Sequence, residues 1–253
     1  MLNQPDYTRY AEYYDFFELA GFSESKNTNS FLVDLFGING VQTVVDFACG
    51  TGAQTIGLAK AGFKLTASDL NPEMVKVAQK KSKRLKNITF CCGDMCREKY
   101  GTFDAAICMF NAIGHLNRAA FLKFLLNAKN NLNAGGLLVF DILNYEAMKT
   151  SIFEEYAHMS KEVIIKDHLI SHVRNCTLNK RKKQIEISSL ICSQDGTHKP
   201  EKWSENWQMQ IYTSDQIVRL LNKAGFKEIH IFGLNGTPFN NELSDSILAV
   251  AQK

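Results

Sequence analysis

A short glycine-rich loop is the first feature of the sequence with residue types suited to binding a nucleotide-like ligand. The loop, Ala48-Cys49-Gly50-Thr51-Gly52, directly follows the hydrophobic residues 43–47. Small residues let a ligand approach the backbone closely, and a helix that starts after them offers free amide groups and the positive end of its dipole. Because small residues in such a turn can also serve tight packing alone, the loop does not identify a ligand by itself.

The residues around the loop disfavour two common nucleotide-binding patterns. A P-loop needs a lysine after its second glycine, and none follows Gly52. The dinucleotide fingerprint G-x-G-x-x-G is matched by Gly50 and Gly52, but Thr55 stands where the third glycine belongs. Other residues must therefore decide which ligand the loop serves.

Two aspartates lie where the second and third predicted strands end. The carboxylate of Asp69 offers two acceptor oxygens to the vicinal hydroxyls of a ribose. Asp94, in Gly93-Asp94-Met95, could accept a hydrogen bond from the exocyclic amine of adenine while Met95 packs on the ring. Each acid alone is more often a cap or a surface residue, but the carboxyl ends of parallel strands meet at one edge of a sheet. Their joint spacing therefore favours an adenosine site.

These residues must be positioned by alternating strands and helices. Strands are predicted at residues 43–47, 63–68, 87–92, 103–110 and 136–142. Helices are predicted at 53–61, from the cap Asn71-Pro72-Glu73, and at 117–132. Strands that alternate with helices indicate right-handed crossovers and a parallel sheet covered on both faces, so the fold class is α/β.

The pattern changes after Asn144, where strands follow one another without helices. Three strands are predicted, at residues 162–173, 184–192 and 203–212. In the last of them apolar and polar residues alternate, which indicates an inserted antiparallel sheet with one apolar face. Trp203 and Trp207 on that face either line a pocket or, as the simpler interpretation, bury the sheet against the main domain.

The helical rhythm returns near the C-terminus. Thr213 and Gln216 fit a capping box, and the helix is expected to end near Gly225, before strands at 226–232 and 246–251. We therefore expect a helical N-terminal cover (1–40), a ligand-binding core (41–145), an inserted antiparallel sheet (146–212) and a C-terminal part of the core (213–253).

The composition is that of a globular protein with a substantial core: 253 residues, 45% hydrophobic and 22% charged. A net charge of +3 is too small to argue for nucleic acid or an acidic membrane surface, and no apolar run is long enough to cross a bilayer. Seven cysteines, an odd number without paired metal-ligand spacing, predict neither a disulfide framework nor a metal site. A cytoplasmic location is the expectation.

Several motifs in order give the chain a family resemblance. VVDFACGTG, ASDLNPEMV, CCGDM, FDAAICMFNAIGHL and NAGGLLVFDI are similar, in turn, to the glycine-rich, ribose-binding, adenine-binding, fourth and fifth motifs of class I S-adenosylmethionine-dependent methyltransferases. TSDQIVRLLNKAGF and ILAVAQK continue the resemblance at the C-terminus. It implies a Rossmann-like sheet of seven mostly parallel strands, flanked by helices, whose final hairpin places one antiparallel strand. It also implies that the inserted antiparallel sheet (146–212) is a lid on the acceptor side. Ala48 departs from the glycine that is commonest at its position.

The resemblance also implies the cofactor contacts. Residues of the glycine-rich segment hold the methionine part, Asp69 and Leu70 the ribose, Asp94 and Met95 the adenine, and Phe110 and Asn111 border the sulfonium. Aromatic faces attract cations, which gives Phe110 a physical reason to be there. The full set of cofactor residues expected is Tyr14, Asp46, Ala48, Cys49, Gly50, Gly52, Asp69, Leu70, Met74, Gly93, Asp94, Met95, Phe110 and Asn111.

A general base would help an amine acceptor, which must be neutral to attack a sulfonium. His115, just past the fourth strand, is the candidate, because histidine titrates near neutrality. The alternative is that His115 caps or packs at the start of the next helix. Tyr10 and Tyr14 could close over the cofactor, or could simply belong to an aromatic core at helical spacing.

Within the superfamily, YTRYAEYYDFF, CMFNAIGHL and the insertion after FDILN resemble small-molecule methyltransferases. The expected activity is methyl transfer (EC 2.1.1.-) to nitrogen or oxygen of a small molecule. Asn111-Ala112-Ile113-Gly114 lacks the Asn/Asp-Pro-Pro-aromatic sequence expected for methylation of base amino groups. A methyltransferase of tRNA or protein, and a non-catalytic protein that binds S-adenosylmethionine, are the alternatives; the oligomeric state is not readable from the sequence.

Overall fold

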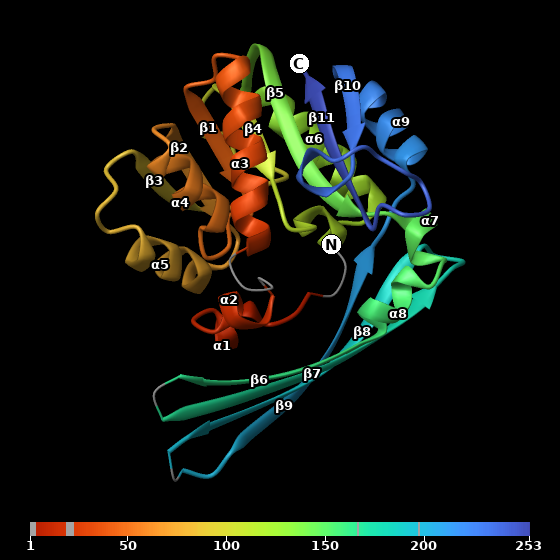
Figure 1. The fold of residues 1–253 in the computed structure, drawn as a ribbon. Coiled ribbons are helices and arrows are strands. Elements are labelled where there is room, and N and C mark those ends of the chain that lie inside the picture. The colour runs from red at the N-terminus through yellow and green to blue at the C-terminus, as the bar shows by residue number, and fades with distance from the viewer. Residues whose placement is uncertain (1–3, 19–22, 166, 197) are drawn as a thin grey trace.

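The computed structural model describes residues 4–18, 23–165, 167–196 and 198–253, without the side chains of residues 10, 23 and 24. Within these ranges the strands form two sheets, one of seven strands and one of four. Figure 1 shows the seven-stranded sheet with its helices above, and the four-stranded sheet extending below it. No helix in the described ranges is long and apolar enough to span a membrane.

The seven-stranded sheet has the order β10-β11-β5-β4-β1-β2-β3. Its strands are β1 (Thr43–Phe47), β2 (Lys64–Asp69), β3 (Ile88–Cys92), β4 (Phe103–Cys108), β5 (Leu132–Leu143), β10 (Lys227–Phe232) and β11 (Ser246–Gln252). The pairs among β1 to β5 are parallel, whereas β11 runs antiparallel to both β5 and β10. The expected Rossmann-like fold with one antiparallel strand is confirmed, and the strand order reverses between β1 and β4, where open α/β sheets bind ligands.

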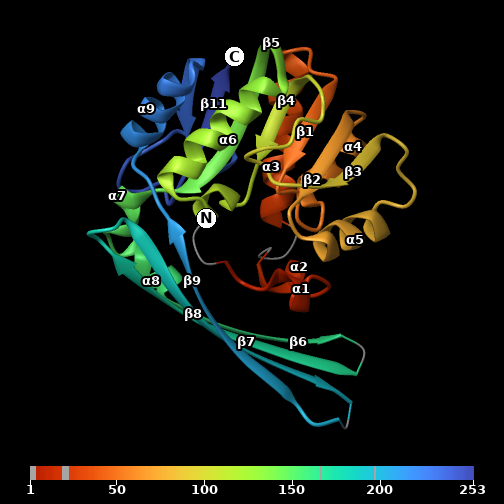
Figure 2. The same cartoon turned by 180° about the vertical axis from the view of Figure 1, so that it is seen from behind.

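Helices cover both faces of this sheet. On one face, α6 (Arg118–Asn130) and α9 (Ser214–Ala224) bury Phe121, Phe124 and Leu221 in the larger core cluster. On the other, α3 (Ser23–Ile38) and α4 (Ala53–Lys60) contribute Leu32, Phe36 and Leu58 to a second cluster. Figure 1 looks onto the face covered by α3, and Figure 2 looks onto the face covered by α6.

The helix caps follow the sequence closely. The side chain of Asn71 accepts from the backbone amides of Glu73 and Met74 at the start of α5 (Pro72–Lys81). The predicted capping box at Thr213 and Gln216 is present at the start of α9, which ends at Gly225 with φ +81°. Such signals need only local residues, which is why they could be predicted.

The inserted sheet has four antiparallel strands: β6 (His158–Ile165), β7 (His168–Asn179), β8 (Gln184–Asp195) and β9 (Glu201–Gln210). The prediction of a single strand over 162–173 is therefore wrong, because β6 ends and β7 begins within that stretch. No glycine, proline or asparagine lies between Ile165 and His168 to signal a turn. Two short helices, α7 (Tyr145–Met148) and α8 (Ile152–Ala157), precede the sheet and were also not predicted.

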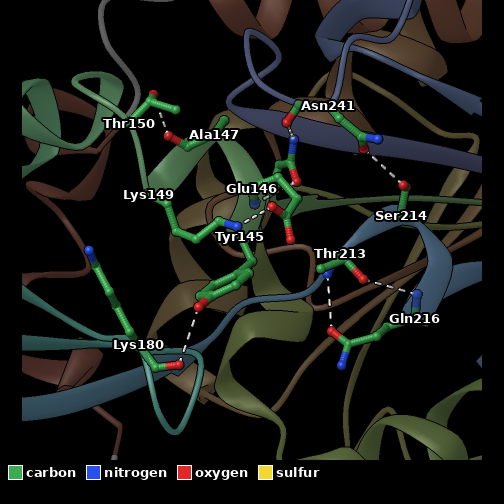
Figure 3. Close-up of polar contacts among 11 residues, drawn as sticks. Tyr145, Glu146, Ala147, Lys149, Thr150, Lys180, Thr213, Ser214, Gln216 and Asn241 are labelled. Carbon is green, nitrogen blue, oxygen red and sulfur yellow. Dashed lines mark hydrogen bonds and ion pairs between the residues drawn. The ribbon is translucent and has the colours of Figure 1, made fainter.

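The base of the inserted sheet is fixed to the core by a small apolar cluster and a network of polar contacts. Trp207 is buried with Tyr145, Met148 and Ile211 rather than facing a pocket, which agrees with the simpler interpretation of this tryptophan. The Tyr145 hydroxyl donates to the Lys180 carbonyl at 3.3 Å. Figure 3 shows this contact together with the Thr213 capping box. The two sheets are thus joined through α7 and the start of α9.

The N-terminal cover lies between the two sheets, as both views show (Figures 1 and 2). Of the predicted cover (1–40), only the part with α1 (Tyr7–Tyr10) and α2 (Tyr14–Phe17) lies there, and we keep the name for this part, because α3 packs on the seven-stranded sheet instead. Phe17 is buried against Ile170 and Ile191 of the inserted sheet. On the other side, Lys81 of α5 forms an ion pair with Asp15 at 2.5 Å. The cover therefore contacts both the core and the insertion.

Candidate functional site

A cavity of about 400 Å³ lies at the carboxyl edge of the seven-stranded sheet, beneath the N-terminal cover. The ends of β1, β2, β3 and β4 all contribute to it, as expected for parallel strands that end at one edge. Most of the predicted site residues line it: Tyr14, Asp46, Ala48, Cys49, Gly50, Asp69, Leu70, Met74, Gly93, Asp94, Met95, Phe110 and His115. We refer to it as the cofactor cavity.

The glycine-rich loop turns sharply beneath this cavity because its backbone enters the left-handed region. Ala48, Gly50 and Gly52 have φ values of +56°, +53° and +86°. At Ala48 this conformation disfavours any side chain, on the order of 1 kcal/mol, which accounts for the preference for glycine among similar loops. Gly52 does not line the cavity; it is the N-cap of α4, and a Cβ there would come within 3.1 Å of the Cβ of Ala78.

Asp69 is held by backbone amides of two segments. Its Oδ2 accepts from the Gly50 amide and its Oδ1 from the Asn71 amide, both at 2.8 Å. Burial raises the pKa of Asp69, while these hydrogen bonds favour the charged form and oppose the rise. Each carboxylate oxygen keeps a second lone pair, so the side chain can still accept from a diol.

Asp46 is buried beneath the same loop. Its Oδ2 accepts from the Thr55 hydroxyl at 2.5 Å, so the residue in the third glycine position of the dinucleotide pattern orients this carboxyl group. Burial is the main cause that raises the pKa of Asp46 to about 7, and the nearby charge of Asp69 adds to it. In the sequence, Thr55 stands out only as a missing glycine, and no local pattern indicates its contact with Asp46.

The turn after β3 places Asp94 and Met95 at the cavity. Asp94 accepts from the Cys96 amide at 2.8 Å, which fixes the turn. A Cβ on Gly93 would lie 2.3 Å from the Tyr100 hydroxyl, so no larger residue fits there without a shift. The turn is therefore built for close packing, with its polar edge toward the cavity.

His115 ends a short 3-10 helix, η1 (Ala112–His115). Its Nε2 is 2.9 Å from the Tyr7 hydroxyl, and its Nδ1 is buried without a hydrogen-bond partner among the described residues. Burial lowers the pKa of His115 to about 4, so the imidazole is neutral at physiological pH. It does not cap α6, because Asn117 does so by accepting from the Ala120 amide.

The tyrosines of the cover also reach the cofactor cavity. Tyr7 and Tyr14 line it, and Tyr7 was not among the predicted site residues. Burial strongly raises the pKa of both phenols, which therefore stay neutral. The side chain of Tyr10, the other tyrosine expected to close over the cofactor, lies outside the described residues.

A second cavity, of about 250 Å³, adjoins the first. Tyr14, Met109 and Phe110 line both, so they form a shared wall. Asn111 lines the second cavity rather than the cofactor cavity. Phe110 and Asn111 have φ values of +59° and +53°, and this left-handed turn separates the two spaces. We refer to the second space as the acceptor-side cavity.

The acceptor-side cavity has charged groups that are not among the predicted site residues. Arg174 Nη1 contacts Glu18 Oε1 and Oε2 at 3.0 and 2.9 Å, which ties β7 to α2. The Tyr156 hydroxyl donates to Asp245 Oδ2 at 2.6 Å. Asp141, near the carboxyl end of β5, is buried at 6% exposure. Asp141 could have been predicted from the sequence, because it lies near the end of a predicted strand of the parallel sheet. No sequence pattern marks Glu18 and Arg174 as a pair.

Comparison with known proteins agrees with this geometry. Residues 44–136 match the family described as a methyltransferase domain. A putative methyltransferase of Geobacillus sp. (strain WCH70) is 26% identical, over 86% of this chain and 87% of that protein. Human glycine N-methyltransferase is 31% identical, but over about half of each chain, 49% and 48%. An S-adenosylmethionine-dependent methyltransferase of Clostridium acetobutylicum has a similar structure, with a TM-score of 0.78, 19% identity, and coverage of 98% and 99%.

The strand order, the cavity at the point where it reverses, and the domain match support one class of protein. This chain has the fold of the class I S-adenosylmethionine-dependent methyltransferases, and residues 44–136 match a methyltransferase domain. The fold expected from the sequence motifs is thereby confirmed.

Proposed function

We propose that this protein transfers the methyl group of S-adenosylmethionine to a nitrogen of a small molecule. The observation that carries the proposal is the pair of adjoining cavities, which share the wall formed by Tyr14, Met109 and Phe110. A methyl donor in one and an acceptor in the other would meet at that wall. Transfer by in-line displacement needs mainly such positioning and the exclusion of water.

The cofactor cavity fits S-adenosylmethionine. Asp69 would hold the ribose hydroxyls, the turn at Asp94 and Met95 the adenine, and the loop at Gly50 the methionine part. The left-handed backbone at Gly50 leaves space above it, since a Cβ there would meet nothing within 4 Å. When bound, this cofactor supplies an activated methyl group on a positively charged sulfur. Phe110 and the neutral tyrosines of the cover would face that charge.

The acceptor-side cavity favours a small amine. Its volume of about 250 Å³ suits a small molecule, and Asp141 and Asp245 line it beside apolar groups such as Ile185 and Met209. Carboxylates stabilise a nearby ammonium and repel an anionic acceptor. Human glycine N-methyltransferase is similar to about half of this chain, and its name states that it methylates a nitrogen. A cytoplasmic location stays a prediction from the cysteine content.

Calorimetry and an activity screen test the proposal. S-adenosylmethionine and S-adenosylhomocysteine should bind with dissociation constants in the micromolar range, and NADH should not bind. Methyl transfer should appear with at least one small amine in a panel that also contains hydroxyl and carboxyl acceptors and bulk tRNA. Binding of NADH with no binding of either adenosyl compound would refute the cofactor; transfer to tRNA alone would refute the acceptor class.

A further inference from the structure

One carboxylate oxygen of the acceptor-side cavity has no hydrogen-bond partner. Asp141 Oδ2 accepts from the Asn111 amide at 3.0 Å, whereas Oδ1 is buried and unpaired among the described residues. A buried polar atom without a partner is costly, so its retention in a cavity wall calls for an explanation. A hydrogen-bond donor on a bound molecule would satisfy it.

The groups that face this cavity set the charge around Asp141. They are Tyr14 from α2, Glu18 directly after α2, Tyr156 from α8, Arg174 and Cys176 from β7, and Asp245 before β11. Arg174 forms an ion pair with Glu18. The negative charge of Asp245 raises the pKa of Asp141. Burial first, and Asp245 in addition, raise the pKa of Asp141 to about 7, against the backbone hydrogen bonds from Asn111 and Phe110.

The other candidate base is placed differently. His115 lines the cofactor cavity and not the acceptor-side cavity, and its Nε2 is already paired with the Tyr7 hydroxyl. Its pKa of about 4 makes it a weak base at neutral pH. General bases work best when their pKa lies near the working pH, a condition that Asp141 meets and His115 does not.

We propose that Asp141 is a catalytic residue whose Oδ1 accepts a proton from the ammonium form of the acceptor. The proposal rests on the proposed function, because it assumes an amine in the acceptor-side cavity. The ammonium N–H bond breaks and its electron pair stays on nitrogen, while Asp141 becomes a neutral carboxylic acid. The lone pair on nitrogen then attacks the methyl carbon and forms the new N–CH₃ bond. The C–S bond breaks, and its electron pair stays on sulfur. Asp141 afterwards returns its proton to solvent.

A purely structural role for Asp141 makes a different prediction. Oδ2 supports the left-handed turn at Asn111, and an asparagine side-chain oxygen could accept the same hydrogen bond. Asp141→Asn therefore keeps the turn but removes the group that takes the proton. Asp215→Asn, an exposed residue in the first turn of α9, is the matched control.

The first measurement is turnover with the amine found by the screen. Asp141→Asn should lower kcat by roughly 100-fold or more, the usual contribution of a general base, while calorimetry shows an unchanged affinity for S-adenosylhomocysteine. Wild-type kcat should rise with pH through neutrality, since the charged carboxylate is the active form, and Asp141→Asn should lose that rise. A kcat within twofold of wild type would overturn the assignment.

The second measurement does not need activity. Carbon-13 NMR of aspartate carboxyl groups, in protein saturated with S-adenosylhomocysteine, should show one group that titrates near neutrality and is missing in Asp141→Asn. Adding 2-aminoethanol, a small ammonium probe, should lower its midpoint, and ethylene glycol should not. A midpoint in the ordinary aspartate range overturns the proposal. If S-adenosylmethionine does not bind the wild type at all, the proposed function fails instead, independently of Asp141.

Discussion

The two cavities are built in different ways. In the cofactor cavity, Asp69 and Asp94 are held by backbone amides of neighbouring turns at one edge of the sheet. In the acceptor-side cavity, Asp141 is also held by a backbone amide, that of Asn111, but Glu18 and Asp245 are held by side chains from distant segments, Arg174 and Tyr156. The first arrangement depends on the sheet itself, whereas the second depends on how the cover and the insertion pack. We infer that changes in the two cavities should affect cofactor and acceptor separately.

The largest effect outside Asp141 is expected at Asp69. Asp69→Ala removes the proposed acceptor of the ribose hydroxyls, which also accepts from the Gly50 amide. Affinity for S-adenosylhomocysteine should fall by about 1–3 kcal/mol, roughly 5- to 150-fold, in calorimetry. Asp34→Ala, on the exposed side of α3, is the control and should bind normally. An unchanged affinity in Asp69→Ala would disprove the ribose assignment.

A smaller effect is expected when the ion pair between Glu18 and Arg174 is broken, and it should fall on the acceptor rather than on the cofactor. Both side chains are largely buried, and their charges are paired at 2.9 Å. Glu18→Gln and Arg174→Gln should each raise KM for the acceptor several-fold, while the dissociation constant of the cofactor changes by less than about twofold. Expressed as free energy, the increase in KM for the double variant should be smaller than the sum of the increases for the two single variants. An equal loss of cofactor affinity would show that the two cavities are not independent.

The smallest effect is expected for the contact between Tyr7 and His115. Tyr7→Phe removes the hydroxyl that contacts His115 Nε2 in the wall of the cofactor cavity, so cofactor affinity should fall by about 1 kcal/mol or less. The lowered pKa of His115 keeps it neutral above about pH 4, so the loss should be constant from pH 5.5 to 8.5. Calorimetry across that range checks this. A loss that grows as the pH falls through 6.5 would mean that His115 takes up a proton near its ordinary pKa.

Much of the fold could be predicted because its signals are local. The strand at 43–47, the Asn71 cap and the Thr213 capping box lie where the sequence placed them. The hairpin of β6 and β7 was missed because Lys166-Asp167 between the two strands contains neither glycine nor proline, so the turn signal is weak. In the site, the predicted residues lie in the expected cavity except Gly52 and Asn111, whose positions depend on the packing of α4 and on the turn after β4.

The sequence by itself determined the class of ligand, because the loop, Asp69 and the Gly93-Asp94-Met95 turn are short motifs attached to consecutive strands. Strands that run parallel bring such motifs to one edge whatever the rest of the chain does. Only the tertiary structure decided what surrounds Asp141. Glu18, Arg174 and Asp245 reach that cavity from the cover, the insertion and the last loop. No local pattern marks them, because burial and charge at Asp141 arise from contacts between segments far apart in the chain.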